Sequence, residues 1–542
     1  MSEVATAAAV PVAGGNALRK VIIALRKVII GASLGTAFEW YDFFLYAFLA
    51  VFFSALFFPR GNETGALLAS LATFGAGFVV RPVGALVFGR FGDMLGRKRT
   101  FLITIILMGV GTSAIGMIPS FATIGWMAPA LLVFLRLIQG FSLGGEYSGA
   151  ATYAIEHADR DRRGRQTGWL QITPSIGQIG AIGTILLCRS VLSAEDFAQW
   201  GWRIPFLLSL PFLACSIYIR MQLEESPVFQ EMKKSKRLST APIREALGSL
   251  TNLKIMLPAF AICAAEGVAL YTGQLHAFYF IQTVLKIDPG TASLLEAIVI
   301  GAAIPATLLL ARLSDRIGRK RILLAGALLS ALTTFPLFRA LTAYGNPALA
   351  RFDATTTIVI AGADCSVPLF NFFNAPQTVC SQMAGYLNRQ GVDYVIAPPQ
   401  VAGNVTLTIG ATRLDGFQPS AVMAALKAAG FPEKADPSEV NRPMIVLLLL
   451  IVTSYGLMLW APLSAFLVEQ FPARIRYTSV SVTANLGSGW FGGMSPFLIS
   501  ALSLRNGNIY YGLWFPVCVT AIACVVGTLF VRDQNGRDIG HH

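Results

Sequence analysis

The sequence predicts an all-α integral membrane protein with twelve transmembrane helices in two six-helix halves and a small extracytoplasmic α/β insertion. Of its 542 residues, 54% are hydrophobic and only 13% are charged, whereas about 25% of the residues in soluble domains are charged. Apolar runs of about 20 residues, the length that crosses a bilayer, recur along the chain. A short charged segment also occurs twice, at corresponding places between such runs.

The first charged segment reads Gly-Arg-Phe-Gly-Asp-Met-Leu-Gly-Arg-Lys-Arg and covers 89–99, and the second copy covers 311–321. Each contains one central carboxylate, a glycine and a run of three cations. Such a turn between two apolar runs requires headgroup water, so each copy marks a cytoplasmic hairpin between two spanning helices. Two copies predict two homologous halves.

Apolar runs place the twelve helices. Their predicted ranges are 28–57, 64–89, 100–119, 126–156, 166–192, 203–222, 254–284, 291–314, 322–344, 442–470, 476–504 and 509–531. Lys and Arg collect in alternate connections, at 90–99, 160–165, 220–237, 312–321 and 474–476. Because cationic loops stay in the cytoplasm, both termini are expected there.

The same runs divide the chain into domains. The predicted parts are a cytoplasmic tail (1–27), a first half (28–222), a cytoplasmic linker (223–253), a second half (254–531) and a cytoplasmic tail (532–542). An insertion, 345–441, interrupts the second half between helices 9 and 10. It holds seven acidic and five basic residues, and its strand-like and helix-like stretches indicate a small α/β cap. Its position outside the cytoplasm would allow Cys365 and Cys380 to form a disulfide.

Composition also limits the partners. The formal net charge is +13, but its cations lie between apolar runs, which indicates contact with the lipid bilayer and not with nucleic acid. No His, Cys, Asp or Glu spacing suggests a metal site, no cofactor is implied, and no nucleophile and base pattern indicates an enzyme. We expect a monomer.

The pattern Gly-x-x-x-Asp-x-x-Gly-Arg-Lys resembles the loop between helices 2 and 3 of the major facilitator superfamily, and the second copy resembles the loop between helices 8 and 9. Met94 and Ala311 depart from the usual pattern. Further stretches resemble the metabolite:proton symporter branch: Glu39-Trp-Tyr-Asp42-Phe-Phe, Arg81-Pro-Val-Gly, Arg136-Leu-Ile-Gln139-Gly140, Gly144-Gly145-Glu146 and Glu225-Ser-Pro-Val-Phe. The resemblance implies a major facilitator fold and proton-coupled transport.

Ionisable residues inside spanning helices are costly and therefore suggest a function. Glu39 and Asp42 lie at i and i+3 on helix 1, and their mutual repulsion would favour a protonated carboxyl. The resemblance assigns proton coupling to Asp42 and Arg136, with an ion pair that forms and breaks. Glu146 is a further candidate for proton relay. The alternative is that these acids only neutralise nearby cations.

Arg81 could bind a substrate carboxylate through its guanidinium group, or it could be a fixed partner of a buried acid. Other polar or aromatic residues of the spanning helices are candidate lining groups, although such residues are also common in helix packing. They are Gln139, Gln171, Gln178, Tyr271, Gln274, Trp460 and Asn485.

The two hairpins predict a cytoplasmic gate, in which the motif aspartate caps a neighbouring helix and the arginine pairs with an acid across the loop. The alternative is that their charges only determine topology. The gate residues are Gly89, Asp93, Gly96, Arg97, Lys98, Asp315, Gly318, Arg319, Glu156 and Glu469.

Together these features predict a proton-coupled symporter that imports a small organic acid across the inner membrane by alternating access, with a site between the halves. A zwitterion such as proline or betaine is the alternative substrate class. A membrane sensor whose outer cap binds a ligand, without transport, is a second alternative.

Overall fold

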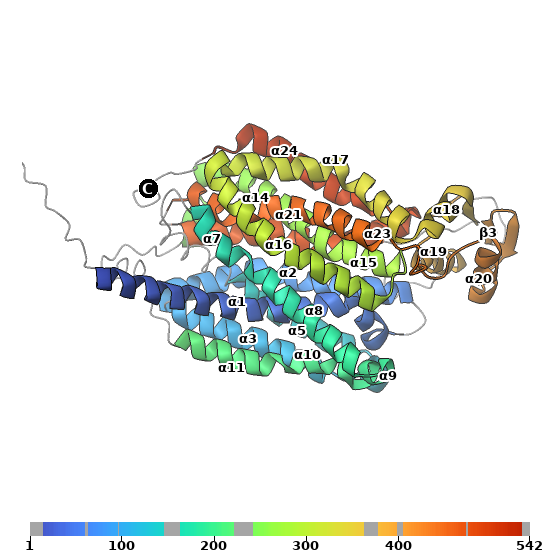
Figure 1. Ribbon diagram of the computed structural model, residues 1–542, viewed down its shortest axis with the longest axis horizontal. Helices are drawn as coiled ribbons and strands as arrows, with labels where there is room; N and C mark the ends of the chain where they lie inside the picture. Colours follow the sequence, from blue (N-terminus) through green and yellow to red (C-terminus); the bar gives the residue numbers. More distant parts are fainter. Residues whose placement is uncertain are drawn as a thin grey trace, which may run out of the picture.

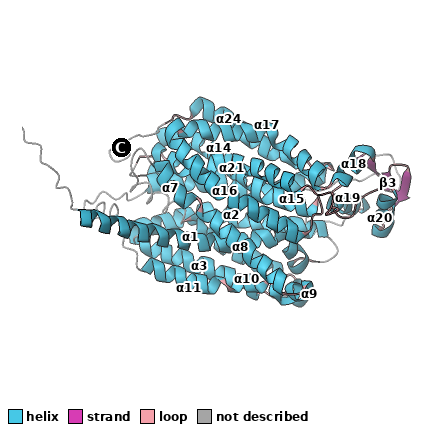
Figure 2. Ribbon diagram, in the orientation of Figure 1, coloured by secondary structure: helices cyan, strands magenta, loops and turns pink. Residues whose placement is uncertain are grey.

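The structure is a computed structural model that describes residues 15–59, 63–95, 97–145, 163–221, 242–362, 378–397, 405–472 and 475–533. Long helices run side by side in an elongated bundle, and a small α/β unit projects from one end (Figures 1 and 2). We call the chain between helices α17 and α21 the cap. The two ends of the bundle are the cap end and the motif end, which carries Asp315 and Arg319.

The first half occupies one side of the bundle (Figure 1). Its elements are α1 (Gly15–Phe57), α2 (Glu63–Leu95), α3 (Arg97–Met117), α4 (Phe121–Ile124), α5 (Met127–Gly144), α7 (Arg163–Gln171), α8 (Thr173–Val191), α9 (Ala194–Asp196), η2 (Phe197–Gly201), α10 (Arg203–Leu207) and α11 (Ser209–Met221). Helices α7 and α8 form one continuous span, as do α9 to α11.

The second half lies alongside it. Its elements are α13 (Pro242–Leu247), α14 (Leu250–Tyr271), η3 (Thr272–His276), α15 (Ala277–Thr283), α16 (Pro289–Ile317), α17 (Arg319–Gly345), α21 (Arg442–Gln470), α22 (Arg476–Ala484), η4 (Asn485–Gly492), α23 (Gly493–Asn506), η5 (Tyr511–Leu513) and α24 (Trp514–Phe530). Two of these segments, η3 and η4, are π-helical and interrupt long helices.

The helices account for the twelve predicted spans. Among the described residues, ten helical stretches are long and apolar enough to cross a membrane. The apolar part of the third span is shorter and covers Leu102–Met117. The eleventh, which runs through α22, η4 and α23, is rich in Ser, Thr and Gly and is largely buried inside the bundle. Large apolar side chains such as Leu332 and Leu529 are exposed, as expected for surfaces that face lipid.

The cap confirms the predicted α/β insertion. It contains α18 (Pro347–Thr355), β1 (Ile358–Ala361), α19 (Val379–Gln390), β2 (Val395–Ile396), β3 (Thr406–Ile409), β4 (Thr412–Asp415) and α20 (Pro419–Ala428). The strand order is β2-β1-β3-β4, with β1 parallel to β2 and antiparallel to β3. Cys380 is disulfide-bonded; Cys365, its predicted partner, lies outside the described residues.

The two halves meet along two seams. Helix α2 packs on α22, η4 and α23, and α16 packs on α7 and α8. Within the first half, glycines bring α2 and α5 into close contact: a Cβ atom on Gly140 would lie 1.7 Å from the carbonyl oxygen of Gly77. Small residues allow this approach in lipid. This close contact between α2 and α5 fixes the depth of Arg81, on α2, and of Arg136, on α5.

Candidate functional site

A cavity lies between the two halves, about midway along the bundle. The space free of protein atoms there is about 820 Å³, which includes space that opens to solvent. The lining residues come from both halves: Trp40, Phe44, Phe78, Arg81, Leu143, Pro174, Ser175, Gln178, Glu266, Leu270, Tyr271, Gln274, Leu457, Trp460, Leu463, Ala484, Asn485, Ser488 and Gly489. Most of the wall is apolar or aromatic, with a few polar groups, as is typical of small-molecule sites.

Arg81 supplies the cation of this cavity. It is 9% exposed, and its Nε and Nη2 atoms have no hydrogen-bond partner among the residues that the structure describes. The guanidinium carbon lies 3.8 Å from the ring centroid of Phe78 and 4.8 Å from that of Phe43. Tyr271 is its polar neighbour. A buried guanidinium with free donors that borders a cavity is suited to bind a carboxylate.

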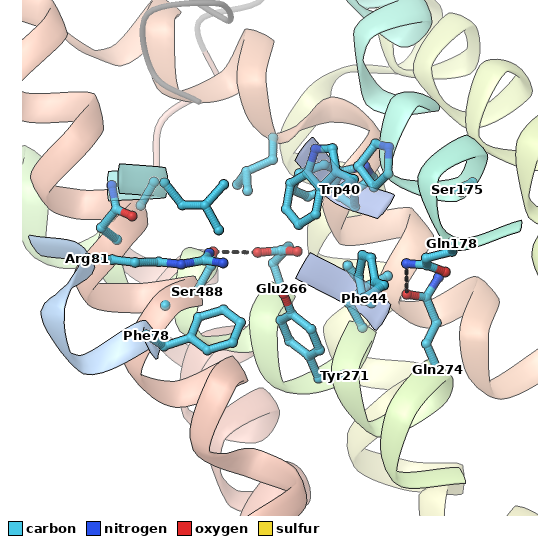
Figure 3. A pocket seen from close by; sticks show the side chains of 18 of the residues that line it. Trp40, Phe44, Phe78, Arg81, Ser175, Gln178, Glu266, Tyr271, Gln274 and Ser488 are labelled. Atoms are coloured by element: carbon cyan, nitrogen blue, oxygen red, sulfur yellow. Dashed lines mark hydrogen bonds between the residues drawn. The ribbon is translucent and has the colours of Figure 1, made fainter. Parts of the chain in front are cut away.

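Glu266 supplies the anion. Its side chain is 1% exposed, and the hydroxyl of Ser488 donates a hydrogen bond to its Oε2 atom. Figure 3 shows Arg81, Ser488 and Glu266 extending toward one another into the cavity. Helices α14 and η4 come this close because a Cβ atom on Gly267 would lie only 2.6 Å from the carbonyl oxygen of Ser488. The cavity therefore contains one guanidinium group and one carboxyl group.

Sequence reasoning placed neither Glu266 nor Ser488 in the site. A carboxylate inside a span is a recognisable signal. No sequence feature distinguishes Ser488 from the many serines used in helix packing, and its role becomes visible only where η4 meets α14.

Six of the predicted lining residues do border the cavity: Arg81, Gln178, Tyr271, Gln274, Trp460 and Asn485. Gln178 on α8 donates a hydrogen bond to Gln274 on η3 over 3.1 Å, which joins the two halves across the cavity (Figure 3). The π-helical turn η3 contains Gln274. Such turns are frequently found at functional sites.

The structure places the other two predicted lining residues elsewhere. Gln171 donates to the carbonyl oxygen of Trp460 over 2.7 Å, and the Trp460 indole donates to the carbonyl oxygen of Gln171 over 2.9 Å. Gln171 thus links α7 to α21. Gln139 accepts a hydrogen bond from Arg136 and donates to Thr112 over 2.7 Å. Both amides are used in helix-to-helix contacts and are not among the residues that line the cavity.

The predicted ion pair between Asp42 and Arg136 is not formed in this conformation. Asp42 accepts a hydrogen bond from Ser209, and Thr112 is its second hydrogen-bonding neighbour. Arg136 donates to Gln139 over 2.7 Å. Gln139 and Thr112 therefore lie between Asp42 and Arg136. Through these two side chains, Asp42 and Arg136 belong to one buried chain of polar groups.

Arg136 is completely buried, and aromatic rings surround its guanidinium. Its Cζ atom lies 4.5 Å from the ring centroid of Tyr46, 5.0 Å from Phe43 and 5.4 Å from Phe74. Phe43 contacts Arg81 as well. The ring of Phe43, the residue after Asp42, thus contacts both Arg136, in the polar chain, and Arg81, in the cavity wall. Glu39, one turn before Asp42, is also buried.

The second copy of the charged motif connects the halves at the motif end. Asp315 accepts hydrogen bonds from the backbone N–H groups of Gly164 and Arg165, over 2.9 and 2.8 Å, at the first turn of α7. A carboxylate is stabilised at a helix N-terminus. Arg319 donates to Asp315 over 2.6 Å.

The same cluster continues to α21. Arg319 lies 3.2 Å from Glu469, and Arg163 lies 3.5 Å from it, so one carboxylate is shared by arginines of both halves. All three side chains are buried. Gly318 has φ +98° between α16 and α17, a conformation that favours glycine. These residues occupy the place predicted for the gate.

The first copy of the motif lies where α2 ends and α3 begins. Gly89, Asp93, Arg97 and Lys98 lie in helices, but their side chains are not described, and Gly96 lies outside the described residues. Glu146 and Glu156 also lie outside them. In the part of the chain that is described, no group of three or more His, Cys, Asp or Glu could hold a metal ion.

Comparison with known proteins identifies similar sequences and folds. A family model described as "MFS/sugar transport protein" matches residues 147–472, and one described as "Sugar (and other) transporter" matches residues 28–249. The shikimate transporter of Escherichia coli (strain K12) is 36% identical over 322 residues, which cover 59% of this chain and 73% of that protein.

A proline/betaine transporter of Salmonella typhimurium is 44% identical over 207 residues, or 38% of this chain and 41% of that protein. Among solved structures, a D-xylose-proton symporter superposes with a TM-score of 0.62 at 15% identity, covering 95% of this chain and 99% of the other. This structural likeness concerns the fold.

Proposed function

Because this chain belongs to the major facilitator superfamily of sugar and metabolite transporters, we propose that it is a proton-coupled symporter that imports a small carboxylate-bearing metabolite, such as an organic acid, across the inner membrane. The observation that carries this proposal is Arg81. It is a buried cation with two unpartnered N–H donors on the wall of a cavity between the halves. A carboxylate would satisfy both donors in a bidentate geometry.

Alternating access requires the halves to rock around the cavity. The structure has contacts between the halves at both ends of the bundle, through Glu469 at the motif end and through Tyr279 at the cap end. We interpret this arrangement as a conformation in which the halves are in contact on both sides of the cavity. Import would follow from opening of the cap end to load and of the motif end to release, with the cap outside the cell.

We assign proton binding to Asp42. It is buried beside Ser209 and Thr112, and the polar chain through Gln139 leads to Arg136. Addition of a proton to Asp42 removes a negative charge near this chain. Arg136 would then shift against Phe43, which also contacts Arg81. This contact offers a direct route by which the proton site influences the substrate site.

The proposal is tested by uptake of labelled organic acids into proteoliposomes with and without an inward proton gradient. We expect gradient-dependent accumulation by the wild type and loss of binding and uptake in Arg81→Gln. Asp42→Asn should equilibrate substrate without accumulating it. Arg413→Gln, which removes an arginine that is 71% exposed in the cap, is the matched control and should behave like the wild type. Ligand binding without accumulation by the wild type would instead support a sensor.

A zwitterion is the second candidate substrate, and Glu266 is the observation that favours it. Arg136 is not among the residues that line the cavity, where the basic and acidic side chains are Arg81 and Glu266. The rings of Trp40, Phe44 and Trp460 could also receive an ammonium group. Competition between a betaine and the acid of the same carbon skeleton distinguishes the candidates. Glu266→Gln should weaken uptake of the betaine alone.

A further inference from the structure

The cap contacts both halves, but in very different ways. Its connection to the second half, into which it is inserted, includes the buried Tyr394. The Tyr394 hydroxyl donates to the carbonyl oxygen of Leu504 over 2.6 Å, and its backbone N–H donates to Gly507 over 2.8 Å. Asp393 accepts from the backbone N–H of Ile509 over 2.7 Å.

Two further hydrogen bonds attach the base of the cap to the loop after α15. Lys286 donates to the carbonyl oxygen of Arg389, at the end of α19, and Asn346 donates to the carbonyl oxygen of Leu285 over 3.1 Å. With the bonds of Tyr394 and Asp393, these contacts surround the attachment of the cap. The cap therefore moves with the second half.

Among the described residues, the hydrogen bond and ion pair between the cap and the first half lie at the start of α2. The Thr64 hydroxyl donates to the carbonyl oxygen of Gly385 over 2.8 Å, and Arg389 forms an ion pair with Glu63. Gly385 and Arg389 lie one turn apart on α19, as Glu63 and Thr64 lie together in the first turn of α2. A Cβ atom on Gly385 would be 3.1 Å from the Thr64 Oγ1 atom, so the two helices touch closely at this point.

We propose that α19 is a latch of the cap end: it holds α2 of the first half while the cap end is closed, and it releases α2 each time this end opens. The reason is geometric. If the cap is fixed to the second half, any separation of the halves at the cap end must break the contacts at Thr64 and Glu63. These contacts are one hydrogen bond, at Thr64, and one ion pair, at Glu63, and both lie at the edge of the bundle. Such weak contacts can form and break in every transport cycle. The inference rests on alternating access and not on the identity of the substrate.

A designed disulfide tests the latch. The Cβ position of Gly385 is 3.5 Å from the Cβ atom of Thr64, at the short end of the range for disulfides. We expect Thr64→Cys combined with Gly385→Cys to cross-link on oxidation and to lose uptake at least tenfold, with recovery after reduction. Each single variant and the wild type, given the same oxidant and reductant, are the controls. Absence of a cross-link, or a cross-linked protein that transports like the single variants, would refute the latch.

A second experiment needs no substrate and no glycine substitution. Spin labels at Ser193→Cys and Asn506→Cys, exposed positions at the ends of α8 and α23, would report the width of the cap end by electron paramagnetic resonance. Cys215 and Cys518, which are exposed, would be replaced by serine. Glu63→Arg should raise the open fraction about two- to fivefold, and adding Arg389→Glu should restore it. An unchanged distance distribution in Glu63→Arg would count against the latch.

Discussion

The two ends of the bundle are closed by different chemistry. At the motif end, the halves are joined by charges: Asp315 caps α7, and Glu469 is shared by Arg163 and Arg319. At the cap end, Tyr279 donates to the carbonyl oxygen of Ala47 over 2.6 Å, and Phe48 packs edge-on against Phe278. The first closure depends on a few buried charges, whereas the second combines ring packing, single hydrogen bonds and the contact with α19.

This difference indicates how each end responds to a change. Buried charges that share one carboxylate form a cooperative unit, because the loss of that carboxylate removes a counterion from two buried arginines at once. Ring contacts and single hydrogen bonds contribute smaller and more independent amounts. We therefore expect single substitutions to open the motif end strongly and the cap end only partly.

The largest effect is expected for Glu469→Gln. It leaves Arg163 and Arg319 buried without their shared carboxylate, at a cost of about 3–5 kcal/mol. Thermal unfolding in detergent and the accessibility of the motif end to a charged thiol reagent would measure the loss. Glu439→Gln is the matched control, because it breaks an ion pair with Arg351 at side chains that are 42% and 68% exposed and should cost less than about 1 kcal/mol. Equal effects of the two substitutions would contradict the contrast between the ends.

A second prediction concerns the cap, where two carboxyl groups lie near one another. Asp353 on α18 is half-buried near Asp393, and burial together with the charge of Asp393 raises the pKa of Asp353 to about 8. The folded cap therefore binds a proton that the unfolded chain releases above its ordinary pKa near 4. Stability of the cap should fall as the pH rises from about 4 to 8.

Hydrogen exchange of α18 and β1 in the intact protein would follow this pH dependence. Asp353→Asn should remove most of it and should stabilise the cap at pH 8 by an amount on the order of 2 kcal/mol, because solvent partly screens the site. Asp415→Asn, at an exposed strand position, is the control. A pH profile that stays the same in Asp353→Asn would show that another group titrates.

Sequence reasoning predicted the helices, the halves and the cap because each depends on local composition. Apolar runs, two copies of a charged hairpin and a change to acidic, strand-forming residues are all visible along the chain. The predicted pairing of Asp42 with Arg136 is not formed in this conformation, because Thr112, from a third helix, and Gln139 lie between them. Such an arrangement depends on how helices far apart in sequence pack.

The composition of the cavity was predictable only in part, for a related reason. Arg81 and Gln178 lie on helices that keep an α-helical repeat through the site, and both border the cavity. Ser488 lies in η4, as does Asn485, which was predicted and borders the cavity. An amide inside a span is conspicuous, whereas a serine is as common in helix packing as in a site. The partner of Glu266 could therefore be found only in the folded structure.

The smallest effect is expected for Tyr279→Phe at the cap end. The substitution keeps the ring and removes the hydroxyl that donates to Ala47, so it should cost about 1 kcal/mol and raise the open fraction of the cap end about fivefold. The spin labels at the ends of α8 and α23 would measure this change. Tyr511→Phe, at a ring that is 41% exposed, is the control. If Tyr279→Phe opened the cap end as completely as Glu469→Gln opens the motif end, a single hydrogen bond would hold the cap end, and the proposed contribution of α19 would be unnecessary.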